Sequence, residues 1–159
     1  FIALNVSARQ LEEPGLVERM LAQLDAHDLP RDRLEGEITE SLVFKHSLIK
    51  HLIDECHAAG MEVALDDFGT GYSNLGPLLG LNFDRIKLDQ SFTRSMDQPR
   101  GKAIVQAIVA MTRALGSEMI AEGVETQDQL DTLRELDCEY AQGWLVGRPV
   151  SLQSVLDTD

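Results

Sequence analysis

The sequence has little positive charge. Of its 159 residues only 14 are lysine or arginine, whereas 27 are aspartate or glutamate, so the formal net charge is −13 at pH 7. Phosphate backbones are held by clustered lysines and arginines, so no polymeric nucleic acid is expected as a partner. The same deficit argues against adsorption to anionic membranes. A phosphate-containing substrate remains open if a divalent cation lies between it and the carboxylates.

Cysteines and long apolar runs are also scarce. Cys56 and Cys138 are far apart and form no CxxC pair, which argues against a disulfide framework and favours a reducing cytoplasmic setting. Within the most apolar stretch, the longest uninterrupted run, Ala107–Met111, is too short to span a membrane, so no direct membrane insertion is expected. The chain begins at Phe1 inside an apolar segment, and we expect it to be part of a longer protein.

Short apolar runs typical of strands alternate along the sequence with stretches of helical spacing. Short apolar runs predict six strands: Phe1–Val6, Leu34–Thr39, Met61–Leu65, Phe83–Leu88, Glu118–Ala121 and Tyr140–Val146. Between them, helical spacing predicts helices over Leu16–Leu24, Leu48–Cys56, Ala103–Leu115 and Leu130–Leu136. The third of these helices is apolar nearly all round and should be the best buried. The alternation implies parallel strands joined by right-handed crossovers, an α/β fold in one domain over residues 1–159.

Several residues predict where the helices begin and end. Pro14 suits a first helical turn, and Gly60 and Gly116 suit the left-handed position after a helix. Thr126 precedes Gln129 by three residues, which is the spacing of a capping box.

Polar residues fall at the ends of the predicted strands. They are Asn5, Glu37, Glu40, Asp66, Asp67, Lys87, Asp89, Glu122 and Gln142. From Asn5 to Glu37, Asp66, Lys87, Glu122 and Gln142 the steps run from 20 to 35 residues, which suits one strand and one helix each. Parallel strands would bring these groups to one mouth, the place of the active site in β/α barrels.

The residue types at this mouth point to metal chemistry. Glu37, Asp66, Asp67 and Glu122 would repel one another unless a cation neutralised them, and oxygen ligands select Mg²⁺, Mn²⁺ or Ca²⁺. A single lysine among them can orient a water molecule or counter a phosphate charge. The pattern therefore indicates metal-assisted hydrolysis of a phosphoester, with up to two metal ions. The alternative is that some of these residues are helix caps or solvated strand ends.

The segment Asp66–Ser73, with sequence DDFGTGYS, is the sharpest local motif. Adjacent aspartates point to opposite faces of a regular strand, so they share a site only if the strand ends or bulges there. Gly69 and Gly71 permit tight turns and a close approach of the backbone to a ligand. Taken alone, the first four residues favour an ordinary aspartate-rich turn.

Six motifs in order along the chain resemble one family. They are LNVSARQL from Leu4, EITES from Glu37, LDDFGTGYS from Leu65, DRIKLD from Asp84, AEGVET from Ala121, and YAQGW from Tyr140 through Gly147-Arg148-Pro149. The sequence resembles the EAL-type cyclic-di-GMP phosphodiesterases of bacterial signalling. The resemblance implies a TIM-like (β/α) barrel with one antiparallel strand, here incomplete with about six βα units. It also implies hydrolysis of cyclic di-GMP to the linear dinucleotide pGpG, with Mg²⁺ or Mn²⁺ as cofactor and Ca²⁺ as inhibitor.

The resemblance also implies roles for individual residues. The implied metal ligands are Asn5, Glu37, Asp66, Asp67 and Glu122, and the implied catalytic residues are Lys87, Glu122, Gln142 and Glu40. Lys87 would position or help to deprotonate the attacking water, with Gln142 as its neighbour. Glu40 would brace the 66–73 loop, which is thought to couple dimerisation to metal binding, and Glu125 would be a supporting carboxylate. The implied substrate contacts are Ser7, Arg9, Asp89, Tyr72, Ser73 and Pro149.

One part of the family pattern is missing. The Glu-Ala-Leu segment, whose glutamate is a metal ligand in the family, does not occur, and about two of eight strands are missing with it. We therefore expect the chain to be part of a larger domain, or to have its sheet edges covered by a partner chain. A homodimer, and fusion to sensory or GGDEF modules, are also expected from the resemblance.

Two other functions remain possible from the sequence alone. One is a catalytically inactive receptor for cyclic di-GMP, and the other is an interaction module that binds no nucleotide. Trp144 is expected either in the core or, less favoured, stacked on a guanine, and Arg9 and Arg148 either at a phosphate or in surface ion pairs. The four histidines lie in helical stretches and are not expected to bind metal.

Overall fold

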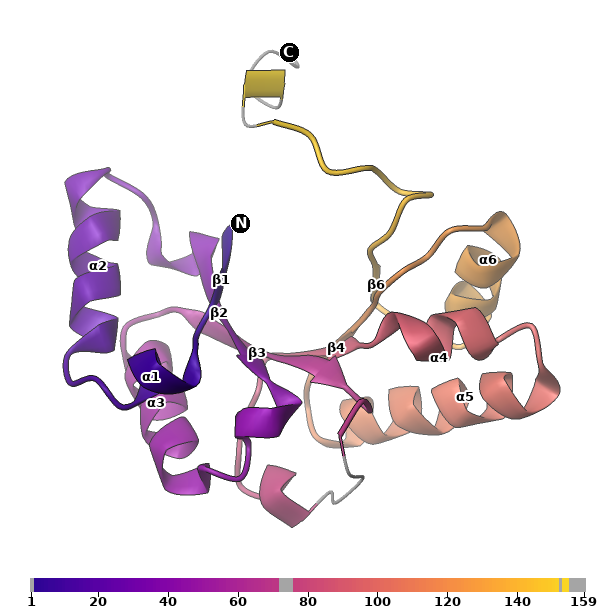
Figure 1. Cartoon of the computed structure of the whole chain (residues 1–159), viewed down its shortest axis with the longest axis horizontal. Helices are drawn as coiled ribbons and strands as arrows, with labels where there is room; N and C mark the ends of the chain where they lie inside the picture. The colour runs from indigo at the N-terminus through magenta and orange to yellow at the C-terminus, as the bar shows by residue number, and fades with distance from the viewer. Residues whose placement is uncertain (1, 72–75, 152, 155–159) are drawn as a thin grey trace.

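The structure is a computed structural model that describes residues 2–71, 76–151, 153 and 154. Its centre is a parallel sheet in which each strand pairs with the next in sequence, in the order β1-β2-β3-β4-β5-β6. The strands are β1 (Ile2–Asn5), β2 (Leu34–Thr39), β3 (Glu62–Phe68), β4 (Arg85–Leu88), β5 (Glu118–Ala121) and β6 (Tyr140–Ala141). The sheet curves into a half-barrel, so the fold is the incomplete TIM-like barrel expected from the sequence (Figure 1).

Helices cover the convex side of this sheet (Figure 1). The α-helices are α1 (Ala8–Leu11), α2 (Leu16–Ala26), α3 (His46–Ala58), α4 (Gln90–Ser95), α5 (Pro99–Ala114) and α6 (Gln127–Glu135). Short 3₁₀ turns are η1 (Arg31–Arg33), η2 (Glu40–Leu42) and η3 (Gly76–Leu78). No described helix is long and apolar enough to cross a membrane.

The strands present two different faces because their side chains alternate in direction. Toward the helices they bury apolar residues, of which Ile38, Val63, Leu65, Leu88 and Met119 are fully buried. Each fully buried side chain of this size stabilises the fold by about 1.5 to 3 kcal/mol before the entropy of ordering is counted. Alternate positions on the other face carry charged groups, so the concave face is the polar one.

Capping chemistry fixes several helix ends as the sequence predicts. Gly60 and Gly116 both have a φ of 80°, the left-handed conformation expected after a helix. The Thr126 hydroxyl accepts a hydrogen bond from the Gln129 amide, and the Gln129 side chain accepts one from the Thr126 amide. The prediction for Pro14 is wrong, because Gly15 is the N-cap and α2 begins only at Leu16.

Three other expectations are wrong, one about the end of a strand and two about burial. The sixth strand stops at Ala141 because the chain turns at Gly143, whose carbonyl accepts hydrogen bonds from the Val146 and Gly147 amides. Gly143 lies so close to the Val124 backbone that a Cβ would not fit there. α5 buries no more of itself than α2 or α3 do, and its Ile104 is 42% exposed, because only one of its faces meets the sheet. Trp144 is 60% exposed rather than part of the core.

Candidate metal and catalytic site

The parallel strands bring their polar ends to one edge of the concave face. Asn5 on β1 lies opposite Glu37 on β2 in the ladder, and Thr39 at the end of β2 lies opposite Asp66 on β3. Glu122 follows β5 directly, and its amide donates a hydrogen bond to the Leu88 carbonyl at 3.1 Å. The sequence spacing therefore predicts correctly which strand ends meet.

Lys87 on β4 lies at the centre of this edge. Its Nζ is 2.8 Å from Glu37 Oε1, 2.9 Å from Asp66 Oδ1 and 3.0 Å from Glu122 Oε1. The lysine side chain is only 9% exposed. Burial by itself lowers the pKa of Lys87, but the three carboxylates override that effect and raise it, so the ammonium stays charged in this arrangement. We call Lys87, Glu37, Asp66 and Glu122 the Lys87 cluster.

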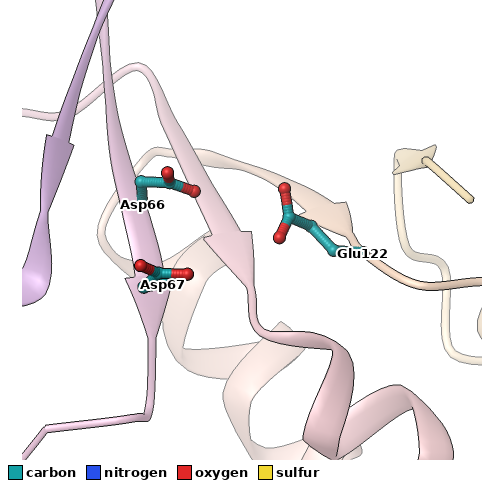
Figure 2. Close-up of side chains that lie close together, drawn as sticks. All are labelled: Asp66, Asp67 and Glu122. Carbon is teal, nitrogen blue, oxygen red and sulfur yellow. The ribbon is translucent and has the colours of Figure 1, made fainter. Parts of the chain in front are cut away.

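A β-bulge brings a second aspartate to the same place. Leu65 pairs with Ile86 and Phe68 with Leu88, so Asp66 and Asp67 together lie opposite the single residue Lys87. Asp67 takes a φ of 56°, which breaks the strict alternation of side chains along β3. The sequence argument required an end or a bulge for the two aspartates to share a site, and the bulge is present. Figure 2 shows both carboxylates projecting toward Glu122.

These three carboxylates form a site of suitable chemistry for a hard cation. One oxygen each from Asp66, Asp67 and Glu122 lies within 4.8 Å of the other two. Desolvation and the charges of Asp66 and Asp89 raise the pKa of Asp67. Burial raises the pKa of Glu122 against the opposing effect of Lys87, and the two aspartates raise it further. An all-oxygen donor set with this excess of negative charge fits Mg²⁺, Mn²⁺ or Ca²⁺.

Glu40 holds the loop that follows the two aspartates. Its Oε2 accepts hydrogen bonds from the amides of Gly69 at 2.8 Å and Gly71 at 3.1 Å. A Cβ at position 71 would lie 3.0 Å from the Glu40 carboxyl group, so a larger residue there would push on this brace. The structure thus places Glu40 where a bracing residue would be needed. Tyr72 and Ser73 lie outside the described residues.

Three other predicted site residues, Ser7, Arg9 and Asp89, contact residues outside the Lys87 cluster. Ser7 and Asp89 are helix N-caps: Ser7 accepts from the Gln10 amide of α1, and Asp89 accepts from the Ser91 amide of α4 at 2.9 Å. The Arg9 side chain is 91% exposed and lies 3.6 Å from Glu13. The alternative of helix caps and surface ion pairs therefore describes the contacts that these three residues make within the chain.

A groove opens beside the Lys87 cluster at the β5–β6 edge. Its volume is about 900 Å³, and its lining includes Glu122, Gln142, Arg94, Trp144, Arg148 and Pro149. The Arg148 guanidinium stacks over the Trp144 ring, 5.0 Å from its centroid, and Arg94 pairs with Glu125 at 3.2 Å. A groove of this size with an exposed aromatic face, basic groups and a carboxylate wall suits a small polar ligand that carries rings and phosphates.

Sequence reasoning missed a second set of charges on the same concave face. Arg85 on β4 forms ion pairs with Glu35 on β2, Glu62 on β3 and Glu118 on β5. Glu35 is 1% exposed, and burial raises its pKa even though Arg85 opposes that shift. Buried parallel strands normally read as continuous apolar runs, so charges at alternate positions of β2 and β4 were the signal that could have revealed this set.

Comparison with known proteins decides which family has this arrangement. The sequence pattern of the EAL domain matches residues 1–149. The chain belongs to the EAL domain family. It is 39% identical to the cyclic di-GMP phosphodiesterase RocR of Pseudomonas aeruginosa over 159 residues, which cover 98% of this chain and 40% of RocR.

Solved EAL domain structures share the fold. The EAL domain of DcpA from Mycobacterium smegmatis superposes with a TM-score of 0.90 at 37% identity, covering 96% of this chain and 70% of that one. The PaMucR phosphodiesterase in complex with c-di-GMP superposes with a TM-score of 0.87 at 36% identity, covering 97% of this chain and 63% of that one. The chain spans about a fifth of the length of several curated relatives.

Proposed function

We propose that this EAL domain hydrolyses cyclic di-GMP to linear pGpG. The observation that carries the proposal is the set of three converging carboxylates, Asp66, Asp67 and Glu122, beside a buried lysine and a groove of ligand size. RocR is named a cyclic di-GMP phosphodiesterase, and PaMucR binds c-di-GMP in its solved complex. We infer the substrate from these relatives, and the carboxylates and the lysine of the site are suited to its metal-assisted hydrolysis.

The cofactor that we propose is Mg²⁺ or Mn²⁺, two ions at full occupancy, with Ca²⁺ as an inhibitor. Asp66, Asp67 and Glu122 would hold the ions, and Glu37 and Asn5 lie on the adjoining strands as further oxygen donors. When bound, such ions lower the pKa of a coordinated water and neutralise phosphate charge. An acidic protein can in this way hold a dianionic dinucleotide.

The chain's own residues would then orient the reacting groups. Lys87 Nζ, fixed by three carboxylates, would donate a hydrogen bond to the attacking water or to a phosphate oxygen. The backbone amide of Gln142 donates to the Ala121 carbonyl at 2.8 Å, so Gln142 lies next to Glu122 across the ladder. The Gln142 side chain would be the second polar partner of the attacking water. Glu40 would keep Asp66 and Asp67 in place through the loop amides.

We propose the substrate contacts more broadly. Pro149 lines the groove, and Ser7, Arg9, Asp89, Tyr72 and Ser73 would complete the contacts of the sugar-phosphate ring. The exposed Trp144–Arg148 pair offers a flat surface against which a guanine could stack. As the family suggests, the domain would act in the cytoplasm as a homodimer, fused to sensory or GGDEF modules.

The test is hydrolysis of cyclic di-GMP by the full-length protein with Mg²⁺, followed by chromatography of the product. Asp66→Asn and Lys87→Ala should each abolish formation of pGpG. The matched controls are Asp54→Asn and Lys50→Ala, which alter an exposed Lys–Asp pair on α3 (2.8 Å). Unchanged turnover in the first two variants would refute these roles. Tight binding of cyclic di-GMP by the wild type without turnover would instead identify a receptor.

A further inference from the structure

The concave face carries two layers of charged side chains with the same arrangement of one cation and three carboxylates. In the Lys87 cluster, one cation on β4 meets a carboxylate from β2, one from β3 and one from the end of β5. One layer below, Arg85 on β4 also meets one carboxylate from each of β2, β3 and β5. We call Arg85, Glu35, Glu62 and Glu118 the Arg85 cluster. Arg85 also lines the groove beside the Lys87 cluster, but the proposed hydrolysis assigns no step to the side chains of the Arg85 cluster.

The two layers are tied together strand by strand. Glu35 and Glu37 are two residues apart on β2, as are Arg85 and Lys87 on β4. Glu62 precedes Asp66 by four residues, and Glu118 precedes Glu122 by four. Even spacing puts each pair on the same face of its strand. Every strand that brings a member of the Lys87 cluster therefore also brings a member of the Arg85 cluster.

The Arg85 cluster sits where the sheet is still regular. Ala64 pairs with Arg85, and Arg85 pairs with Glu118, without any shift of register. The bulge begins directly above, between Leu65 and Phe68. A slip of two residues in any of these strands would move a carboxylate by about 6.6 Å, which exceeds the 4.8 Å within which the metal-site oxygens gather.

The Arg85–Glu35 pair is buried, whereas the Glu62 and Glu118 side chains are 40% and 47% exposed. Buried ion pairs are weak evidence for stability, and their best-attested use is to specify register. The Arg85 side chain is 14% exposed, and the Glu35 side chain is 2% exposed. A guanidinium is a rigid fork of donors that can serve several carboxylates at fixed angles, which a flexible apolar side chain cannot do. The contact with the Tyr140 ring, 5.8 Å from the guanidinium carbon, extends the same side chain toward β6.

We propose that Arg85 is a positioning residue that locks β2, β3, β4 and β5 in register, so that Asp66, Asp67 and Glu122 converge on one cation. The inference rests on the proposed function only for the identity of that cation. Arg85 forms its ion pairs with Glu35, Glu62 and Glu118, and none of these three carboxylates belongs to the candidate metal site. Its effect reaches them through the strands that carry both layers.

The experiment measures Mn²⁺ binding to the full-length protein by calorimetry, with free Mn²⁺ followed by its electron paramagnetic resonance signal. Arg85→Met should weaken Mn²⁺ binding about tenfold to a hundredfold, the range typical of residues that support metal ligands from outside. Arg85→Lys keeps the charge but loses the fork, and it should recover only part of this loss. Arg113→Met is the matched control, because Arg113 also pairs with carboxylates but lies on α5, away from the sheet face.

A double variant separates positioning from stability. Arg85→Met with Glu35→Leu replaces the most buried ion pair by apolar groups, which should restore the unfolding midpoint while leaving Mn²⁺ binding weak, since apolar contacts carry no direction. Wild-type Mn²⁺ affinity in either the single or the double variant would overturn the proposal. If the single variant does not fold, the double variant decides alone.

The failure of this inference is distinguishable from the failure of the proposed function. A wild-type protein that binds Mn²⁺ without hydrolysing cyclic di-GMP would refute the activity, while the Arg85 comparison would still give its result. A wild-type protein that binds no Mn²⁺ would overturn both.

Discussion

The Lys87 cluster and the Arg85 cluster differ in one respect that matters for chemistry. Both hold one cation from β4 against three carboxylates from β2, β3 and β5. At the level of Arg85 the ladder is regular, whereas at the level of Lys87 the bulge adds a fourth carboxylate, Asp67. The extra carboxylate lies at the carboxyl ends of the strands, where ligands bind in barrels of this type.

The same face of the sheet can therefore carry both a cluster of ion pairs that supports the strands and a candidate metal site. In the Arg85 cluster the buried arginine pairs with one buried carboxylate, Glu35, and with two partly exposed ones, Glu62 and Glu118. At the candidate metal site, burial raises the pKa values of Asp67 and Glu122, and the charges of the neighbouring carboxylates raise them further. A divalent cation bound there would favour the charged carboxylates and offset both effects.

The largest effect is expected when the cation of the upper layer is removed. Lys87→Met leaves Glu37 buried without its ion pair, which should lower the free energy of unfolding of the metal-free protein by about 3 to 5 kcal/mol. Turnover should be lost. Mn²⁺ binding, in contrast to Arg85→Met, should not weaken, because a competing cation has gone. Urea denaturation and Mn²⁺ titration check both parts, and weaker Mn²⁺ binding would show that the two layers act alike.

The stability of the metal-free protein should depend on pH through the raised pKa values of two carboxyl groups. A carboxyl whose pKa is raised by folding stabilises the fold below its unfolded pKa, about 4, and this contribution is lost as the pH rises through the raised value. Because Asp67 and Glu122 are of this kind, the metal-free protein should become less stable across that window.

Mn²⁺ should reverse this loss. At a free concentration about 100 times its Kd, it should add about 2.7 kcal/mol to the free energy of unfolding at neutral pH, and less in acid, where protons compete for the carboxylates. Thermal unfolding with and without Mn²⁺ between pH 4 and pH 8 tests this. Equal stabilisation at both ends of the range would contradict the assignment.

The loop brace should have a smaller, local effect. Glu40→Ala removes the acceptor of two amide hydrogen bonds and should cost about 1 to 3 kcal/mol. Turnover should fall because Asp66 and Asp67 lose their support, while the Arg85 cluster is untouched. Denaturation and kinetic assays, with Glu12→Ala as an exposed control on the turn after α1, provide the check. Full activity in Glu40→Ala would argue against a bracing role.

The smallest effect is expected away from both layers. Thr126→Ala removes the side-chain cap of α6 and should cost about 1 kcal/mol of stability. Mn²⁺ affinity and KM for cyclic di-GMP should stay at their wild-type values. A change in Mn²⁺ affinity here would mean that any loss of stability weakens the site, which would undo the distinction drawn for Arg85.

The order of elements and the meeting of strand ends could be predicted from the sequence, because both depend on local periodicity and on the parallel topology. β2 and β5 match their predicted bounds, and the ends of the strands gather the residues expected. The bulge could be stated only as a condition, since its position depends on how β3 pairs with β4, a contact between residues about 20 apart.

Two other features of the structure were not predicted from the sequence. The exposure of Trp144 and of one face of α5 depends on what covers a surface, which periodicity does not record. The Arg85 cluster was not predicted because Glu62, Arg85 and Glu118 lie at the beginnings of their strands, whereas the predicted active-site mouth lies at the strand ends. Charged residues at alternate positions of a buried strand would have pointed to it.

The most direct test of the account concerns Asp67, the carboxylate that distinguishes the two layers. Mn²⁺ binding to the full-length protein should weaken by more than about a hundredfold in Asp67→Asn, beyond the loss typical of a residue outside the ligand shell. The unfolding midpoint of the metal-free variant should not fall, because one repelling charge is removed. An Asp67→Asn variant that binds Mn²⁺ as tightly as the wild type would contradict the central claim that the bulge builds the metal site.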